Sequence, residues 1–100
     1  MDKRQLIIHM LRQLDEQSRS IQQVGAGYYS CVPFARRFNK LLAESRTLFG
    51  ASDSLMGTFE DIAEFDPKDP TDKMKIIQGI RVEINQLIAL LEVVPEGGVQ

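Results

Sequence analysis

The sequence contains no tryptophan, one cysteine and one histidine, and these shortages exclude several classes of protein. The single cysteine, Cys31, cannot form a disulfide within the chain or supply the thiolate set of a zinc or iron–sulfur site. Aromatic residues make up only 7% of the chain, too few for a surface that stacks bases or sugars. We therefore expect neither a metal site nor a cofactor.

Long hydrophobic runs are also missing. The longest uninterrupted apolar run is Leu87–Leu91, far below the roughly 20 residues that cross a bilayer. The basic, apolar opening segment is interrupted by His9 and Arg12, and no small-residue cleavage site follows it, so it does not read as a secretory signal. We expect no membrane association and a cytoplasmic location, which a free cysteine fits.

Charge of one sign is not in excess, because 12 basic residues stand against 14 acidic ones. A net charge of −2 argues against a protein that coats nucleic acid or an anionic membrane. The distribution is uneven, however. Residues 1–49 carry eight basic and four acidic residues (net +4), whereas residues 50–72 carry one and seven (net −6). We expect the two segments to pair, within the molecule or across a dimer.

Apolar residues recur every three to four positions along most of the chain, which predicts amphipathic helices and no strand. The predicted helices cover residues 3–24, 33–49, 53–64 and 70–94, followed by a frayed tail at 95–100. Capping residues support these limits: Asp2 precedes the first helix, Gly25 follows it, and Asp69 with Pro70 begins the last one.

Each helix has an apolar stripe that needs a partner, and the connections are short. We therefore expect one domain, 1–100, folded as an antiparallel four-helix bundle. The alternative is three long helices with a short third helix packed across one end. The predicted inward positions are Leu6, Ile7, Met10, Leu11, Leu14, Ile21 and Val24; Phe34, Phe38, Leu41, Leu42, Ser45, Leu48 and Phe49; Leu55, Met56, Phe59, Ile62 and Ala63; Ile77, Ile80, Ile84, Leu87, Ile88, Leu91 and Val94.

Residues that could carry out catalysis are isolated from one another. His9 lies away from the apolar stripe of its helix and has no second histidine, so we expect it on the surface rather than in an active site. The acidic cluster Asp66, Asp69 and Asp72 lacks the ligand spacing of a calcium loop, and helix capping explains two of its members. The sequence therefore predicts a protein that is not an enzyme.

Apolar residues outside the core stripes favour a protein-interaction or oligomerisation module. Gly79, Val82, Gln86, Leu90 and Val93 lie on the back or edge of the last helix. A glycine inside a helix costs roughly 1 kcal/mol relative to alanine, so close approach of another element is one reason to find Gly79 there. The expected partner is a second copy of the chain, forming a homodimer, or a different protein.

Two tyrosines in the first connection, Tyr28 and Tyr29, belong to the same interface hypothesis. Adjacent aromatic residues on a glycine-flanked loop suit a contact site, whereas the alternative is that they cover the end of the bundle. Both interpretations stay open at this point.

A basic group on the second helix supports an alternative function, a weak nucleic-acid-associated regulator. Arg36, Arg37 and Lys40 share one outer side of that helix. Three cations neutralise about three phosphates, which gives only weak and salt-sensitive binding. We do not expect nucleic acid to be the main partner.

Overall fold

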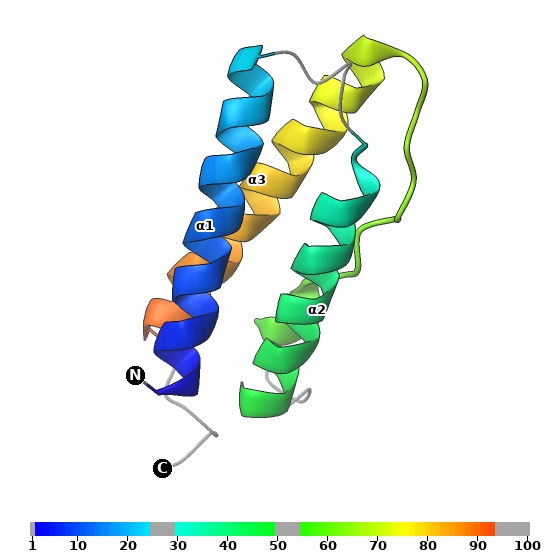
Figure 1. Ribbon diagram of the computed structural model, residues 1–100. Coiled ribbons are helices and arrows are strands. Elements are labelled where there is room, and N and C mark those ends of the chain that lie inside the picture. The colour runs from blue at the N-terminus through cyan, green and yellow to red at the C-terminus, as the bar shows by residue number, and fades with distance from the viewer. Residues whose placement is uncertain (1, 25–29, 50–54, 94–100) are drawn as a thin grey trace.

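The computed structural model describes residues 2–24, 30–49 and 55–93 (Figure 1). These residues form the α-helices α1 (Lys3–Val24), α2 (Val32–Phe49) and α3 (Pro70–Val93), with one turn of 3-10 helix, η2 (Met56–Thr58). The all-α class is confirmed, and three of the four predicted helices agree with the observed bounds to within a residue. The predicted tail, 95–100, lies outside the described residues.

Side-chain caps explain where α1 and α3 begin. The Gln5 N–H donates to Asp2 Oδ1 at 2.8 Å, as expected for a residue that caps α1. At the start of α3, the Thr71 N–H donates to Asp69 Oδ1 at 2.7 Å, and Pro70 occupies the first position, where no donor is needed. The Asp69–Pro70 pair therefore begins the helix as its sequence predicts.

The helix predicted at 53–64 is wrong. Residues 53 and 54 lie outside the described residues, 56–58 form the single turn η2, and 59–67 are extended; we call residues 59–67 the strap. Gly57 and Thr58 are weak helix formers and Pro67 disfavours a helical residue before it, so only a short stretch between them could have been helical. A four-helix bundle is not confirmed, and the alternative of three helices fits the described residues.

The strap runs back along α2, which ends at the opposite end of the molecule from the start of α3 (Figure 1). The seven steps from Phe59 to Asp66 cover about 23 Å if each extended residue advances about 3.3 Å. The strap's partners run from residue 46 of α2 back to residue 31, just before the helix begins, and fifteen helical steps cover about the same distance at 1.5 Å per residue. A helix of seven steps would cover only about 10 Å, so a short connection must be extended to reach the start of α3.

Polar side chains of α2, and the backbone N–H of Cys31 just before it, hold the strap along this length. Asn39 contributes two hydrogen bonds, because its amide donates to the Ile62 carbonyl and accepts from the Ile62 N–H, both at 2.7 Å. The Asn39 amide thus provides hydrogen-bond partners for the backbone N–H and carbonyl of Ile62, which a neighbouring strand would provide in a sheet. The other contacts are Arg46 donating to the Phe59 carbonyl, Arg46 with Asp61, Arg36 with Glu64, and the Cys31 N–H donating to Asp66.

The strap also sets the direction of the last helix. It returns the chain to the end where α2 began, so α3 runs parallel to α2, and α1 runs antiparallel to both (Figure 1). In the predicted antiparallel order, α2 and α3 are the second and fourth helices and therefore run parallel, as observed; the strap takes the place of the predicted third helix between them.

The core lies between the three helices and closes over Met56 and Phe59. Two serines lie in it, and the hydroxyls of Ser18 and Ser45 donate to the Leu14 and Leu41 carbonyls at 2.8 Å. Among the described residues, no buried side-chain nitrogen or oxygen lacks a hydrogen-bond partner. The buried apolar residues are Ile7, Leu11, Leu14, Ile21, Cys31, Ala35, Phe38, Leu41, Leu42, Met56, Phe59, Ile77, Ile80, Ile84, Leu87, Ile88, Leu90 and Leu91.

Four positions predicted to face inward are exposed instead. The buried residues of α1 start at Ile7 and follow one another at alternating steps of four and three, which gives a narrower buried stripe than predicted. Leu6 and Val24 lie outside this stripe. Leu55 and Ala63 are exposed because their segment is not a helix. The side chain of Phe49 and residue Val94 lie outside the described part of the chain.

Candidate protein interface

The outer side of α3 carries a line of exposed residues without a charge. Alternating steps of three and four bring Gly79, Val82, Gln86, Ala89 and Val93 onto one side of the helix, opposite the buried stripe. Val82 is 48% exposed and Val93 76% exposed. We call these five residues the outer line; four of them are predicted interface residues, and Ala89 is one that the sequence reasoning missed although it fits the spacing.

Leu90, the fifth predicted residue of this helix, is buried rather than exposed, with 9% of its surface accessible. It lies at the edge of the outer line, where it shares a groove with Phe59 at the start of the strap. The prediction placed a regular helix at 53–64 and therefore did not anticipate Phe59 beside Leu90. Tyr28 and Tyr29 lie outside the described residues.

The groove between η2 and α3 has a volume of about 300 Å³. Its α3 wall includes Gln86, Ala89 and Val93 of the outer line, and its other wall comes from Leu55 and Phe59. Leu55 is 58% exposed. An open apolar wall of this kind suits an apolar side chain of a partner better than a polar small molecule.

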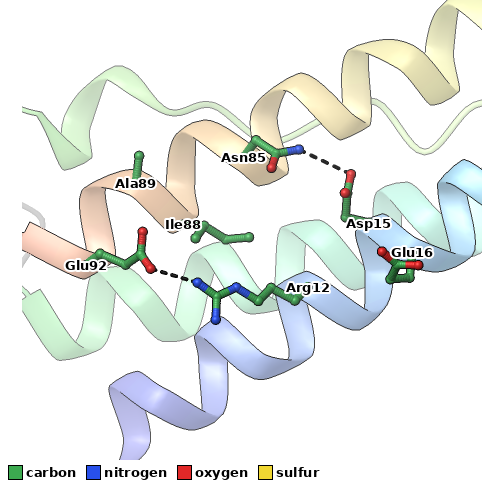
Figure 2. Close-up of a pocket in the computed structure, with 7 residues that line it drawn as sticks. All are labelled: Arg12, Asp15, Glu16, Asn85, Ile88, Ala89 and Glu92. Carbon is green, nitrogen blue, oxygen red and sulfur yellow. Dashed lines mark hydrogen bonds and ion pairs between the residues drawn. The ribbon is translucent and has the colours of Figure 1, made fainter.

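A second groove, of about 380 Å³, lies between α1 and α3 (Figure 2). Ile88 and Ala89 supply its apolar part, and ion pairs and hydrogen bonds cross it: Arg12 to Glu92 at 2.7 Å and Asn85 to Asp15 at 3.2 Å. Ala89 lines both grooves, so at this residue the outer line is a ridge between the two grooves.

No described residue packs against Gly79 closely enough to explain why a glycine stands at this position of α3. A Cβ atom added there would meet nothing within 4 Å, and its backbone is helical. The close approach suggested by the sequence is therefore not made by any described element of the same chain. The roughly 1 kcal/mol that glycine costs in a helix is not offset by such a contact.

The predicted basic group is partly neutralised. Arg36 pairs with Glu64 of the strap at 3.0 Å, whereas Arg37 and Lys40 are exposed. With Pro33 these residues line a shallow groove of about 280 Å³. The expected pairing between the basic and acidic segments is therefore seen at Arg36, and again at Arg46 with Asp61. Arg37 and Lys40 form no ion pair within the part of the chain that the structure describes, and two such cations support phosphate binding less well than three.

Cys31, Asp66 and Lys73 form a group of titratable residues where the strap meets the starts of α2 and α3. Burial, followed by the negative charge of Asp66, raises the pKa of the Cys31 thiol, although Lys73 acts in the opposite direction. The hydrogen bond from the Cys31 N–H, assisted by Lys73, lowers the pKa of Asp66. A buried thiol held in its neutral form is a poor nucleophile, so this group ties the strap to α2 rather than forming a reactive site.

Histidine and the acidic cluster lie as the sequence predicts. His9 is exposed on α1, and Asp69 caps α3. Among residues 2–24, 30–49 and 55–93, no three His, Cys, Asp or Glu side chains come together in a way that could hold a metal ion. In the same part of the chain, no helix has the length and apolar character needed to span a membrane.

Comparisons of the chain with protein-family models, with curated proteins and with solved structures give no significant match.

Proposed function

We propose that the chain is a non-enzymatic, single-domain protein-interaction module whose contact surface is the outer line of α3. The observation that carries this proposal is an uncharged ridge, including two exposed valines, in a chain with 26% charged residues. Charge is depleted, and apolar side chains are gathered, at the centre of protein–protein contacts.

The two grooves support the same function. A partner that packs on the ridge reaches apolar surface on both sides of Ala89, at Ile88 and at Phe59. The ion pair between Arg12 and Glu92 lies at the edge of this surface, where polar residues surround the apolar centre of an interface. The polar rim fixes position, whereas the apolar centre provides most of the affinity.

The test is site-specific photo-cross-linking in the cells that produce the protein. A photoreactive residue at Gln86 should give a discrete protein adduct, whereas the same residue at the exposed position Ser20 of α1 should not. Introducing Val82→Lys and Val93→Lys should remove the adduct while circular dichroism shows unchanged helicity, because both side chains are exposed in the chain alone. No adduct from Gln86, or one that survives both lysines, would show that this surface is not the interface.

Nucleic-acid association through Arg36, Arg37 and Lys40 stays the alternative. Its observation is the exposure of Arg37 and Lys40 beside one groove. Binding should be detectable at low salt and should disappear when Arg37 and Lys40 are changed to Glu. If a mixed-sequence duplex or single strand does not bind at low salt, this function is excluded.

A further inference from the structure

Two neighbouring cations of α2 have no ionic partner in the described part of the chain. Most of the other lysines and arginines pair with carboxylates, as Arg12 does with Glu92. Arg37 and Lys40, by contrast, are exposed, lie one helical turn apart, and form no ion pair with any residue of 2–24, 30–49 or 55–93. Like charges one turn apart on a helix repel each other, so an anion placed between them is favoured.

Two grooves meet at Arg37, and no described carboxylate lines either of them. The first, of about 280 Å³, is formed along α2 by Pro33, Arg36, Arg37 and Lys40. The second, of about 390 Å³, lies between α1 and α2, and Arg37 lines it together with residues of α1. The groove between α1 and α3 differs, because several carboxylates line it. An anion bound at Arg37 therefore meets no negative side chain in the lining of either groove.

The α1 side of the second groove combines hydrogen-bonding groups with an apolar floor. His9, Gln13 and Gln17 recur at steps of four, so they follow one side of α1, and all three are exposed. Neither glutamine side chain has a hydrogen-bond partner among the residues that the structure describes. Met10 is half-buried and Leu14 is buried, and both pack against the core. This groove suits a flat molecule with hydrogen-bonding groups along its edge, since an amide both donates and accepts and a thioether packs well on a ring.

We propose that the two grooves that meet at Arg37 bind a small phosphomonoester with a flat, hydrogen-bonding body, such as a nucleoside monophosphate. The phosphate lies between Arg37 and Lys40, where the guanidinium can donate two parallel hydrogen bonds to its oxygens. The body lies in the groove between α1 and α2, with one face on Met10 and its edge at Gln13 and Gln17. This site is separate from the outer line of α3 and does not depend on the proposed interaction function.

A single nucleotide suits these grooves better than a nucleic-acid chain. Arg37 and Lys40 lie about 4.5 Å apart along the helix axis, which serves one phosphate group rather than a succession of them. Arg36, the residue that could extend the basic surface, pairs with Glu64 at 3.0 Å. A phosphomonoester carries a charge of about −1.5 to −2 at neutral pH, so one such group matches the two unpaired cations.

The test is a titration of the isotope-labelled chain with adenosine monophosphate (AMP) at low salt, followed by nuclear magnetic resonance. AMP is the probe because a glutamine amide can form paired hydrogen bonds with the edge of adenine. Contacts that stay open to water give weak binding, so we expect a Kd on the order of 0.1–1 mM. The side-chain signals of Gln13, Gln17 and Arg37 should shift and saturate. Inorganic phosphate and adenosine, added separately, should each bind at least about tenfold more weakly, because each lacks part of the contacts.

Variants at exposed positions separate the two halves of the site without affecting the core. Arg37→Gln and Lys40→Gln should each weaken AMP binding by about tenfold or more, as expected when a hydrogen bond to a charged group is lost. Lys75→Gln is the matched control and should have no effect, because Lys75 is also exposed but lies on α3, outside both grooves. Changing Gln13 and Gln17 together to Ala should weaken the binding of AMP and leave that of inorganic phosphate unchanged.

Several results would overturn the proposal. One is the absence of saturable shifts at Gln13, Gln17 and Arg37 when AMP reaches about ten times the expected Kd. Another is equal weakening by Lys40→Gln and Lys75→Gln, which would show a non-specific attraction between charges. Tighter binding per site of a single-stranded oligonucleotide than of AMP would replace the small molecule with nucleic acid. None of these results affects the photo-adduct expected at Gln86, so the interaction function is tested independently.

Discussion

Asn39 provides the sharpest test of how the strap is held, because its side chain makes two hydrogen bonds to the backbone of one residue. Replacing Asn39 with Ala leaves both the N–H and the carbonyl of the half-buried Ile62 without this partner. A typical hydrogen bond contributes about 0.5–1.5 kcal/mol net, so the pair should contribute about 2 kcal/mol. In a domain of this size 1 kcal/mol corresponds to about 4–8 °C, so we expect the Tm to fall by roughly 10 °C.

The assay is thermal and urea unfolding together with limited proteolysis of the strap. Lys40→Ala is the matched control, because Lys40 is the next residue of α2, is exposed, and makes no hydrogen bond or ion pair to the strap in the described structure. Asn39→Asp separates the two bonds, since a carboxylate can still accept from the Ile62 N–H but cannot donate to the carbonyl. If Asn39→Ala unfolds like Lys40→Ala, and the strap stays resistant to protease, the two hydrogen bonds do not hold the strap.

Three further changes test other parts of the structure. Leu42→Ala removes a fully buried side chain and should lower the free energy of unfolding by about 2–5 kcal/mol, whereas Leu6→Ala, at a position 47% exposed, should cost much less; equal losses in urea unfolding would contradict the observed core. Gly79→Ala should raise the stability of the dilute monomer by about 1 kcal/mol, because the added Cβ meets nothing within 4 Å, and a lower Tm would show a packing reason that the structure does not contain. Because hydrogen bonding lowers the pKa of Asp66 below its ordinary 3.8, the stability from this carboxylate is complete above that pH and is lost as the pH falls through the lowered pKa. Asp66→Asn should therefore make acid unfolding less steep, as measured by urea unfolding over a series of pH values, and an unchanged acid profile would refute this role.

The three long helices could be predicted from the sequence because their signals are local. The capping residues Asp2 and Asp69 and the spacing of the apolar residues are features of each helix and its immediate neighbours in sequence. The structure confirms both caps and the helices that they begin. The strap could not be predicted in this way. Its apolar residues have helical spacing, whereas the contacts that keep it extended come from Asn39 and Arg46 of another helix. Local periodicity carries no information about such distant partners.

The candidate interface could likewise be predicted only where its features are local to one helix. The exposure of Val82, Gln86 and Val93 follows from the position of each residue on one helix, and the structure agrees. Leu90 lies towards one edge of this surface, as the sequence predicts, but it is buried, and it lines a groove with Phe59 that the periodicity of α3 does not reveal. The grooves also depend on packing between elements, so no pattern within α3 alone could reveal them.

The shape of the strap connects the fold to the candidate interface. After the single turn η2, the chain continues as a strap along α2, where the predicted helix would have gone on for about two more turns. Phe59, at the start of the strap, and Leu90, at the edge of the outer line, then line one groove. A change that made residues 53–64 helical should close this groove and weaken partner binding even with every residue of the outer line intact.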